Sequence, residues 1–365
     1  MGLSIGIVGL PNVGKSTLFN ALTEKKVPAE NYPFCTIDPS VGVVAVPDPR
    51  LWKLTGLSHS KKTIPAAIEF VDIAGLVKGA SEGAGLGNQF LSHIREVDAI
   101  AEVVRIFEDA DVTHVEGAID PVRDIEIINL ELVLADLQVV TKRLASVERD
   151  AKRGDKAALA EQAALQKAEQ TLSAGRLASD AGFSDEERLA LKAIQLLTMK
   201  PIMYVLNKKA GGHNLDEMND ERYQKLVGFF EENKAVFVKV DAAIEGELND
   251  VAGDDRETLR REFGVLDNGV DDLIRAAYRL LGLESFLTTG EDETRAWTVK
   301  IGGTAPDAGA AIHTDFRERF IRAEVVAYDK LMEAGSYAVA REKGWVRTEG
   351  KEYIVKDGDV IEFKI

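Results

Sequence analysis

The chain has 365 residues, of which 45% are hydrophobic and 29% are charged, a composition typical of globular proteins and not of disordered ones. Its formal net charge of −16 argues against a protein that coats nucleic acid non-specifically, because phosphate backbones attract basic surfaces. No apolar run approaches the roughly 18–20 residues that span a bilayer, and the single cysteine, Cys35, excludes an internal disulfide, so we expect a cytoplasmic protein with no membrane partner.

The chain begins with a β-rich stretch, Leu3–Leu10, which runs into Gly-Leu-Pro-Asn-Val-Gly-Lys-Ser at 9–16 and a helical pattern at Ser16–Leu22. A strand, a glycine loop and a helix in this order are the setting of a P-loop, which binds a nucleoside triphosphate. Gly9 and Gly14 permit the sharp turn by which backbone N–H groups wrap the phosphates. The sequence therefore predicts a P-loop nucleotide triphosphatase.

Three side chains of this loop have predicted roles. Lys15 would reach the β- and γ-phosphates, and the Ser16 hydroxyl would bind Mg²⁺. The helix that starts near Lys15 directs its positive dipole end at the phosphates. Asn12 is a candidate ligand for a monovalent cation, a hypothesis that fails if activity is the same in potassium and sodium.

Three further strands are expected at Val41–Val46, Ile64–Ile73 and Ala99–Phe107, with the first two separated by a chain break at Pro47-Asp48-Pro49. Helical stretches alternate with these strands. This alternation predicts an α/β fold with a mostly parallel sheet.

Two predicted switch elements follow the P-loop. Asp72 ends a hydrophobic strand, where its carboxylate can hold Mg²⁺, and the Gly75 N–H can sense the γ-phosphate. Thr36 lies in a loop where a switch threonine would cover the metal ion; the alternative is an ordinary loop threonine. Leu76 occupies the position at which Ras-like enzymes carry the glutamine that orients the attacking water, so hydrolysis should be slow unless another group positions that water.

His114, in a polar loop, and His93, in a helical stretch, are candidates for that group, although a lone histidine is more often a surface residue. Cys35 adjoins Thr36, so its oxidation is a hypothetical redox control; the alternative is a small buried hydrophobe.

From Val122 to Ala174 the chain has no proline and reads as two helices, interrupted at Gly154-Asp155, with Asp155 as the cap of the second. The leucines Leu130 and Leu134 belong to the predicted apolar stripe. We expect an antiparallel hairpin that serves as a spacer or as an arm that touches a partner.

A third helix, Asp185–Leu197, leads into a strand at Pro201–Leu206, so the hairpin interrupts the α/β domain. A last strand at Ala235–Val240 and a helix at Val270–Leu281 would complete that domain.

Base recognition is expected at Asn207-Lys208-Lys209, which ends an apolar strand as the Asn-Lys-x-Asp motif of GTPases does. Position 210 is alanine, so the carboxylate that would grip guanine is missing and guanine preference is not supported. Asn207 can still line the base pocket, and the Lys208 backbone can meet adenine.

From Leu283 onward we expect a separate unit of about 80 residues, with β-rich ends at Ala296–Ile301 and Tyr353–Phe363 and a turn at 356–359. A basic cluster near Trp345 is either a solvated face or a contact for rRNA; its members are Arg341, Lys343, Arg347 and Lys351.

The chain resembles the Obg-like ATPases of the YchF subfamily, within the TRAFAC P-loop GTPases, over nearly its whole length. The motifs that carry the resemblance are GLPNVGKSTLFNALT at 9–23, NYPFCTIDP at 31–39, DIAGLVKGASEGAGLGNQFLSHIREVDAI at 72–100, RAWTVKIGGTAPDAGAAIHTDF at 295–316 and EGKEYIVKDGDVIEF at 349–363. The last two resemble a TGS domain, a β-grasp module.

The resemblance implies ATP hydrolysis with a hydrophobic residue in place of the glutamine, association with the ribosome (its large subunit and rRNA), and links to stress and redox responses. It implies Ser16 and Thr36 as Mg²⁺ ligands and His114 as a catalytic candidate. The triphosphate cradle it implies is Asn12, Val13, Gly14, Lys15, Ser16 and Thr17. It divides the chain into a G domain at 1–125 and 200–282, an inserted helical coiled-coil domain at 126–199 and a TGS domain at 283–365.

The chain departs from the family at Ala210, where the family usually has the glutamate of Asn-x-x-Glu. Three functions stay open: a slow ATPase switch linked to the ribosome, a nucleotide-gated ribosome adaptor with incidental turnover, and a GTPase or dual ATP/GTP switch.

Overall fold

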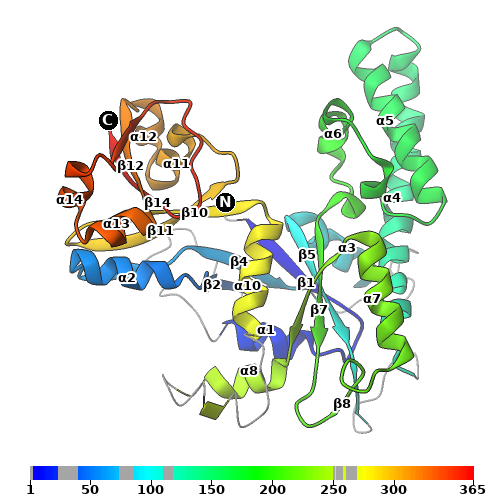
Figure 1. Cartoon of the computed structure of the whole chain (residues 1–365). Helices are drawn as coiled ribbons and strands as arrows, with labels where there is room; N and C mark the ends of the chain where they lie inside the picture. The colour runs from blue at the N-terminus through cyan, green and yellow to red at the C-terminus, as the bar shows by residue number, and fades with distance from the viewer. Residues whose placement is uncertain are drawn as a thin grey trace.

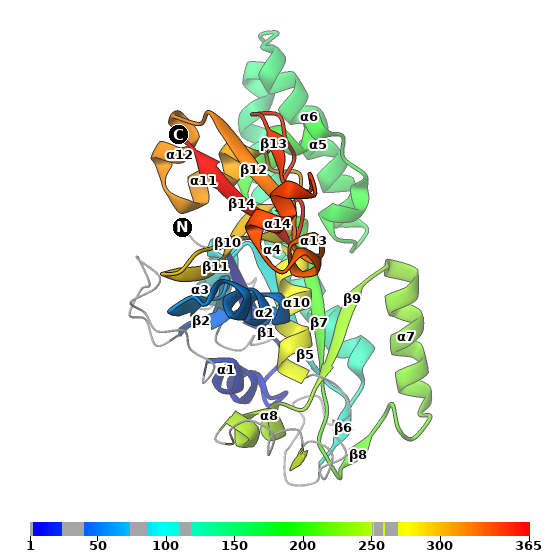
Figure 2. The same cartoon turned by 60° about the vertical axis from the view of Figure 1, so that its left-hand side comes forward.

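The computed structural model describes residues 3–23, 40–73, 86–109, 118–249, 251, 258–259 and 269–365. An α/β body carries a long helical hairpin at one end and a C-terminal β-rich unit beside it (Figures 1 and 2). In both views the hairpin rises away from the end of the body where α1 and α8 lie. None of the helices in these ranges combines the length and the apolar character needed to cross a membrane.

The body is built on a six-stranded sheet in the order β2-β4-β1-β5-β7-β9. β2 is antiparallel to β4, and the other neighbours are parallel, which confirms the predicted mostly parallel sheet. The strands are β1 Ser4–Val8, β2 Val41–Ala45, β4 Ala67–Asp72, β5 Ala99–Arg105, β7 Ile202–Asn207 and β9 Val236–Val240. A small two-stranded ribbon pairs β6 (Phe107–Glu108) with β8 (His213–Asn214).

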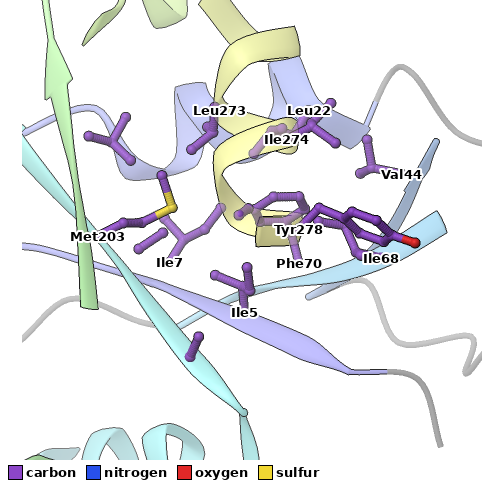
Figure 3. Close-up of a cluster of buried hydrophobic side chains, with 14 of the residues drawn as sticks. Ile5, Ile7, Leu22, Val44, Ile68, Phe70, Met203, Leu273, Ile274 and Tyr278 are labelled. Atoms are coloured by element: carbon purple, nitrogen blue, oxygen red, sulfur yellow. The ribbon is translucent and has the colours of Figure 1, made fainter. Parts of the chain in front are cut away.

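The helices of the body are α1 Lys15–Thr23, α2 Pro49–Ser58, α3 Leu86–Glu96, α7 Glu221–Asn233, α8 Ala242–Asn249 and α10 Gly269–Leu280. α1 and α10 pack on the same side of the sheet (Figure 3). Ile7 and Phe70 of the strands, with Leu22 of α1 and Ile274 of α10, are fully buried there. Burial of this apolar surface is the main favourable term in forming the layered body.

The predicted strand Ile64–Ile73 is wrong as a single strand. The chain forms β3 at Lys62–Ile64, bends at Pro65, and resumes as β4. β3 does not join the central sheet but pairs with β11 of the C-terminal unit, from Lys62↔Glu293 to Ile64↔Arg295. The bend follows from proline, which has no N–H for a ladder and restricts its own φ.

The expected chain break at Pro47-Asp48-Pro49 is the start of α2. The Asp48 side chain accepts a hydrogen bond from the Arg50 backbone N–H at 2.9 Å, and Pro49 occupies the first helical position. Both are standard start signals, because the first helical N–H groups lack partners within the helix.

The helical hairpin is present, as predicted, with α4 at Pro121–Ala151 and α5 at Lys156–Ser173. Asp155 caps α5 by accepting from the Ala158 N–H at 3.0 Å. The ion pair Arg143–Glu161, with an N–O distance of 2.6 Å, joins the two antiparallel helices. The predicted apolar stripe is partly wrong: Leu130 and Leu134 are 51% and 38% exposed. The buried seam of α4 runs one residue before Leu134, through Val133, Val140 and Val147.

The third helix is shorter than predicted. α6 covers only Asp185–Leu191, and the chain returns to the sheet through the 3₁₀ turns Lys192–Ile194 and Leu197–Met199. Gln195 between these turns is left-handed, with φ 52°. The fully buried Asp136 of α4 holds the second turn: its carboxylate accepts from the Leu197 N–H at 3.0 Å and the Thr198 N–H at 2.8 Å.

The C-terminal unit has a six-stranded sheet in the order β13-β12-β14-β10-β11-β3. Three of its strands, Leu283–Thr289, Arg322–Ala327 and Arg347–Glu349, were not predicted. The β-rich end at Tyr353–Phe363 has an isolated bridge at Ile354, a turn at Asp357-Gly358 as expected, and a strand that begins at Asp359. The elements are β10 Leu283–Thr289, β11 Glu293–Lys300, α11 Ala305–Ile312, α12 Thr314–Glu318, β12 Arg322–Ala327, α13 Tyr328–Ala334, α14 Tyr337–Glu342, β13 Arg347–Glu349 and β14 Asp359–Lys364.

Candidate nucleotide-binding site

The P-loop lies between β1 and α1, and its backbone requires the residues found there. Gly9 has φ 154° and Gly14 has φ 101°, in the region that favours glycine, and Asn12 is left-handed at φ 62°. A Cβ at Gly14 would lie 2.2 Å from the Asn207 Nδ2 atom. The glycines therefore serve both the turn and a close approach between the loop and the end of β7.

Asp72 at the end of β4 pairs with Ile7 of β1, directly before the loop, and Lys15 begins α1 directly after it. Lys15 is 9% exposed, and its Nζ donates to the Leu10 carbonyl at 2.8 Å. Burial lowers the pKa of Lys15, against the attraction of Asp72; burial also raises the pKa of Asp72, against the attraction of Lys15. A cation and a carboxylate thus face one small region of the loop.

Ser16 and Thr17 are exposed on the first turn of α1, beside Lys15. Thr17 lines a cavity of about 320 Å³ together with Asn12 and Gly14. An exposed hydroxyl at Ser16 and a carboxylate at Asp72 are oxygen donors of the kind that Mg²⁺ prefers. This end of the sheet therefore fits a triphosphate with its metal ion.

Several predicted residues lie outside the described part of the chain: Cys35, Thr36, Gly75, Leu76 and His114. Their roles stay predictions. His93 is described and is exposed on α3.

Asn207 links the loop to the opposite side of the cavity. Its Nδ2 donates to the Val13 carbonyl at 2.8 Å, and its Oδ1 accepts from the Ala242 N–H at 3.2 Å, at the start of α8. The side chain is 6% exposed. The sequence placed Asn207 in the base pocket; its use as a clamp between the loop and α8 was missed, because Ala242 is distant in sequence.

Position 210 meets a carboxylate that the sequence analysis also missed. The Ala210 N–H donates to the Asp241 side chain, which also accepts from the Ala243 and Ile244 N–H groups at 3.2 and 3.1 Å and so caps α8. Asp241 is 6% exposed. The start of α8, directly after a strand, was the signal that could have found it.

The lysines of this segment are held by carboxylates. Lys208 Nζ lies 2.6 Å from Glu217 and 3.2 Å from Asp216, and Lys209 Nζ lies 2.5 Å from Asp109. Burial would lower the pKa of Lys208, but these hydrogen bonds raise it. Lys208 and Lys209 line the cavity with Phe107 and Asp109, two residues that the sequence analysis did not single out.

Two family models match the chain. One is described as a 50S ribosome-binding GTPase and matches residues 4–142; the other is named for the C-terminal part of YchF GTPases, is described as a protein of unknown function, and matches residues 283–365. Together they span both the P-loop body and the C-terminal unit.

The whole chain also has close relatives. It is 50% identical over 364 residues to the ribosome-binding ATPase YchF of Bacillus subtilis, covering 100% of this chain and 99% of that one. It is 43% identical over 365 residues to Obg-like ATPase 1 of Caenorhabditis elegans, covering 99% and 92%. The solved structure of the Schizosaccharomyces pombe YchF GTPase is 37% identical, covers 100% of this chain and 98% of that chain, and superimposes with a TM-score of 0.87. This chain belongs to the YchF family of Obg-like ATPases.

Proposed function

We propose that the protein binds and slowly hydrolyses ATP with Mg²⁺, and that its nucleotide state controls binding to the ribosome in the cytoplasm. The observation that carries the proposal is the P-loop with Lys15 facing Asp72, in a chain half identical over its full length to a relative named a ribosome-binding ATPase. We also propose a G domain at 1–125 and 200–282, an inserted helical domain at 126–199 and a TGS domain at 283–365.

The proposed roles follow from position. Asn12–Thr17 would cradle the triphosphate, and Lys15 would neutralise charge that develops on it. Ser16, Thr36 and Asp72 would hold Mg²⁺, which when bound supplies further charge neutralisation at the phosphates. The Gly75 N–H would sense the γ-phosphate, and His114 would position water in place of the missing glutamine.

The preference for ATP or GTP separates the ATPase from the GTPase or dual-specificity alternative. Asn207, Lys208 and Lys209 line the cavity, the next residue, Ala210, carries no carboxylate, and the nearby Asp241 accepts hydrogen bonds from backbone N–H groups. We expect non-hydrolysable ATP analogues to bind at least tenfold more tightly than GTP analogues in Mg²⁺ buffer. Equal or reversed affinities would replace the ATPase assignment with a dual or GTP-specific switch. The Ala210→Glu variant, which restores the family's residue, is the matched comparison.

Contact with rRNA of the large subunit is proposed for the basic cluster around Trp345, to which the structure adds Lys330 beside the predicted members Arg341, Lys343, Arg347 and Lys351. The Nζ atoms of Lys330 and Lys343 lie 4.6 and 4.4 Å from the Trp345 ring centroid, so the ring and its cations form one surface. Such aromatic and basic surfaces suit stacking and phosphate contact. We expect K330E/K343E to reduce co-sedimentation with purified large subunits, and Lys356→Glu, outside the cluster, to leave it unchanged.

An adaptor with incidental turnover predicts a different pattern. In that case Lys15→Ala would abolish ribosome binding by removing the nucleotide, whereas a variant that binds ATP without hydrolysing it would bind and leave the ribosome as the wild type does. A slow release by the second variant supports the switch.

A further inference from the structure

We propose that a cavity between β10 and β14 in the C-terminal sheet binds an extended, basic peptide segment of a partner protein. The cavity has a volume of about 690 Å³, within the range of specific ligand sites. It is separate from the P-loop, whose own cavity shares none of its lining residues.

The cavity arises because two neighbouring strands are barely joined. β10 pairs with β11 along its full length, and β14 pairs with β12 along its full length. Residues 269–365 are all described, and within them β10 and β14 pair with each other only at Leu287↔Val360. Thr288 of β10 and Phe363 of β14, beyond that pair, both line the cavity. Strand edges without a neighbour offer backbone N–H and C=O groups to an added strand.

The interior of the cavity suits apolar side chains. Trp297, Phe316, Phe363 and Tyr337 line it, together with Leu331. The Tyr337 hydroxyl is buried and has no hydrogen-bond partner among the described residues. A buried hydroxyl without a partner is costly, so a ligand that supplies a polar atom there gains affinity.

The charged side chains at the cavity favour a positively charged ligand. Three carboxylates line it, Glu291, Glu293 and Glu362, and no lysine or arginine does. Glu362 is paired with Lys364, whereas no ion pair is recorded for Glu291 or Glu293 within the described residues. Two arginines lie over rings of the lining without lining the cavity themselves: Arg295 is 4.0 Å from the Trp297 ring centroid, and Arg341, over the Tyr337 ring, is tied to Glu324. This surface repels the phosphates of RNA and attracts lysine and arginine, which also bind favourably to aromatic rings.

A peptide fits these features better than a compact cation does. The apolar walls, the acidic rim and the two strand edges can be used together only by a ligand that alternates apolar and basic groups along a backbone. In an extended chain, successive side chains point to opposite faces, so apolar side chains can meet the aromatic rings while basic side chains reach the glutamates at the rim.

The test uses the full-length protein and a short dye-labelled peptide in which lysine alternates with valine, measured by fluorescence anisotropy. We expect saturable binding, no binding of the same peptide with glutamate in place of lysine, and at least tenfold weaker binding by E291Q/E293Q. Tyr337→Phe, which leaves the ring in place, should weaken binding about fivefold if the ligand bonds to the hydroxyl. Glu352→Gln, in the same unit but away from the cavity, is the control.

Three outcomes would overturn the proposal. The first is absence of saturable binding by a folded protein. The second is unchanged affinity in E291Q/E293Q, which would place the peptide elsewhere. The third is displacement of the peptide by spermine at matching concentrations, which would assign the cavity to small cations. Because the assay contains neither nucleotide nor ribosome, its result is independent of the proposed ATPase function.

Discussion

Asn207 and Val13 are joined by a hydrogen bond of 2.8 Å from a buried side-chain amide to a P-loop carbonyl, across 194 residues of sequence. The same amide accepts from the Ala242 N–H at the start of α8. One side chain therefore fixes the loop that we expect to hold phosphate relative to the wall that we expect to hold the base.

Asn207→Ala should weaken nucleotide binding at least tenfold, since the Val13 carbonyl and the Ala242 N–H would both lose their partner. Leaving buried polar groups unpaired costs about 1–3 kcal/mol each, so the free energy of unfolding should fall as well. Titration of a fluorescent ATP analogue and urea unfolding measure the two effects. Asn233→Ala, which removes an exposed amide from the end of α7, should change neither.

Gly14→Ala should abolish nucleotide binding while the rest of the protein stays folded. The new Cβ would lie 2.2 Å from Asn207 Nδ2, and the backbone φ of 101° is strained for any residue with a side chain. Gly228→Ala is the matched control: it lies inside α7, where an added Cβ meets nothing within 4 Å, and it should stabilise the helix slightly. Retained ATP affinity in Gly14→Ala would contradict the clamp geometry.

Asp136→Ala should destabilise the protein by about 2–3 kcal/mol, because the buried N–H groups of Leu197 and Thr198 lose the carboxylate that accepts from them. The expected readout is a lower midpoint in chemical unfolding. The exposed Asp150 of the same helix provides the comparison, and Asp150→Ala should change the free energy of unfolding by less than about 0.5 kcal/mol. Equal effects of the two variants would mean that the 3₁₀ turn is not held by Asp136.

Glu102→Gln should stabilise the protein at neutral pH. Glu102 is 1% exposed on β5, and its Oε2 has no hydrogen-bond partner among the described residues. Burial, and secondarily the nearby Asp124, raises the pKa of Glu102 well above its usual value. A carboxyl with a raised pKa in the folded state binds its proton more tightly there than in the unfolded chain. Its stabilising contribution is therefore complete below the unfolded pKa and is lost as pH rises through the folded pKa.

The free energy of unfolding of the wild type and of Glu102→Gln, measured at pH 5 and pH 8, tests the predicted direction of this pH dependence. The wild type should lose stability between the two values relative to the variant, and the variant should exceed it by about 1–3 kcal/mol at pH 8. A variant less stable than the wild type at pH 8 would show that Glu102 is held by a favourable contact.

Several predictions that rest on local signals are confirmed. The P-loop, the alternation of strands and helices, and the Asp155 cap of α5 each depend on residues that are neighbours in the chain. The apolar stripe of α4 was partly misjudged, because Leu130 and Leu134 fit a helical period but lie off the seam that α5 covers. Periodicity identifies a helix more surely than it identifies the face that a partner will bury.

Contacts between distant segments were beyond that reasoning. The second role of Asn207 depends on Ala242, and the carboxylate near Ala210 comes from Asp241, the residue between β9 and α8. Likewise, nothing in Lys62–Ile64 itself distinguishes a strand of the central sheet from a strand of another sheet. Such pairings are set by the packing of the whole molecule, which a single sequence read along its length does not reveal.

Strand β3 lies in the N-terminal part of the chain but pairs with the C-terminal sheet, and this affects folding during synthesis. Lys61, beside β3, donates a hydrogen bond to Asp292, which lies 231 residues later in the chain. The pairing of β3 with β11 can therefore form only after most of the chain has been synthesised. At about 5–20 residues per second that delay is on the order of ten seconds or more, during which β3 has no partner. Excision of the C-terminal unit would consequently leave β3 without its partner strand and would expose the edge of β11. The edge strand of this sheet, β3, is synthesised before all its other strands, as part of the nucleotide-binding body.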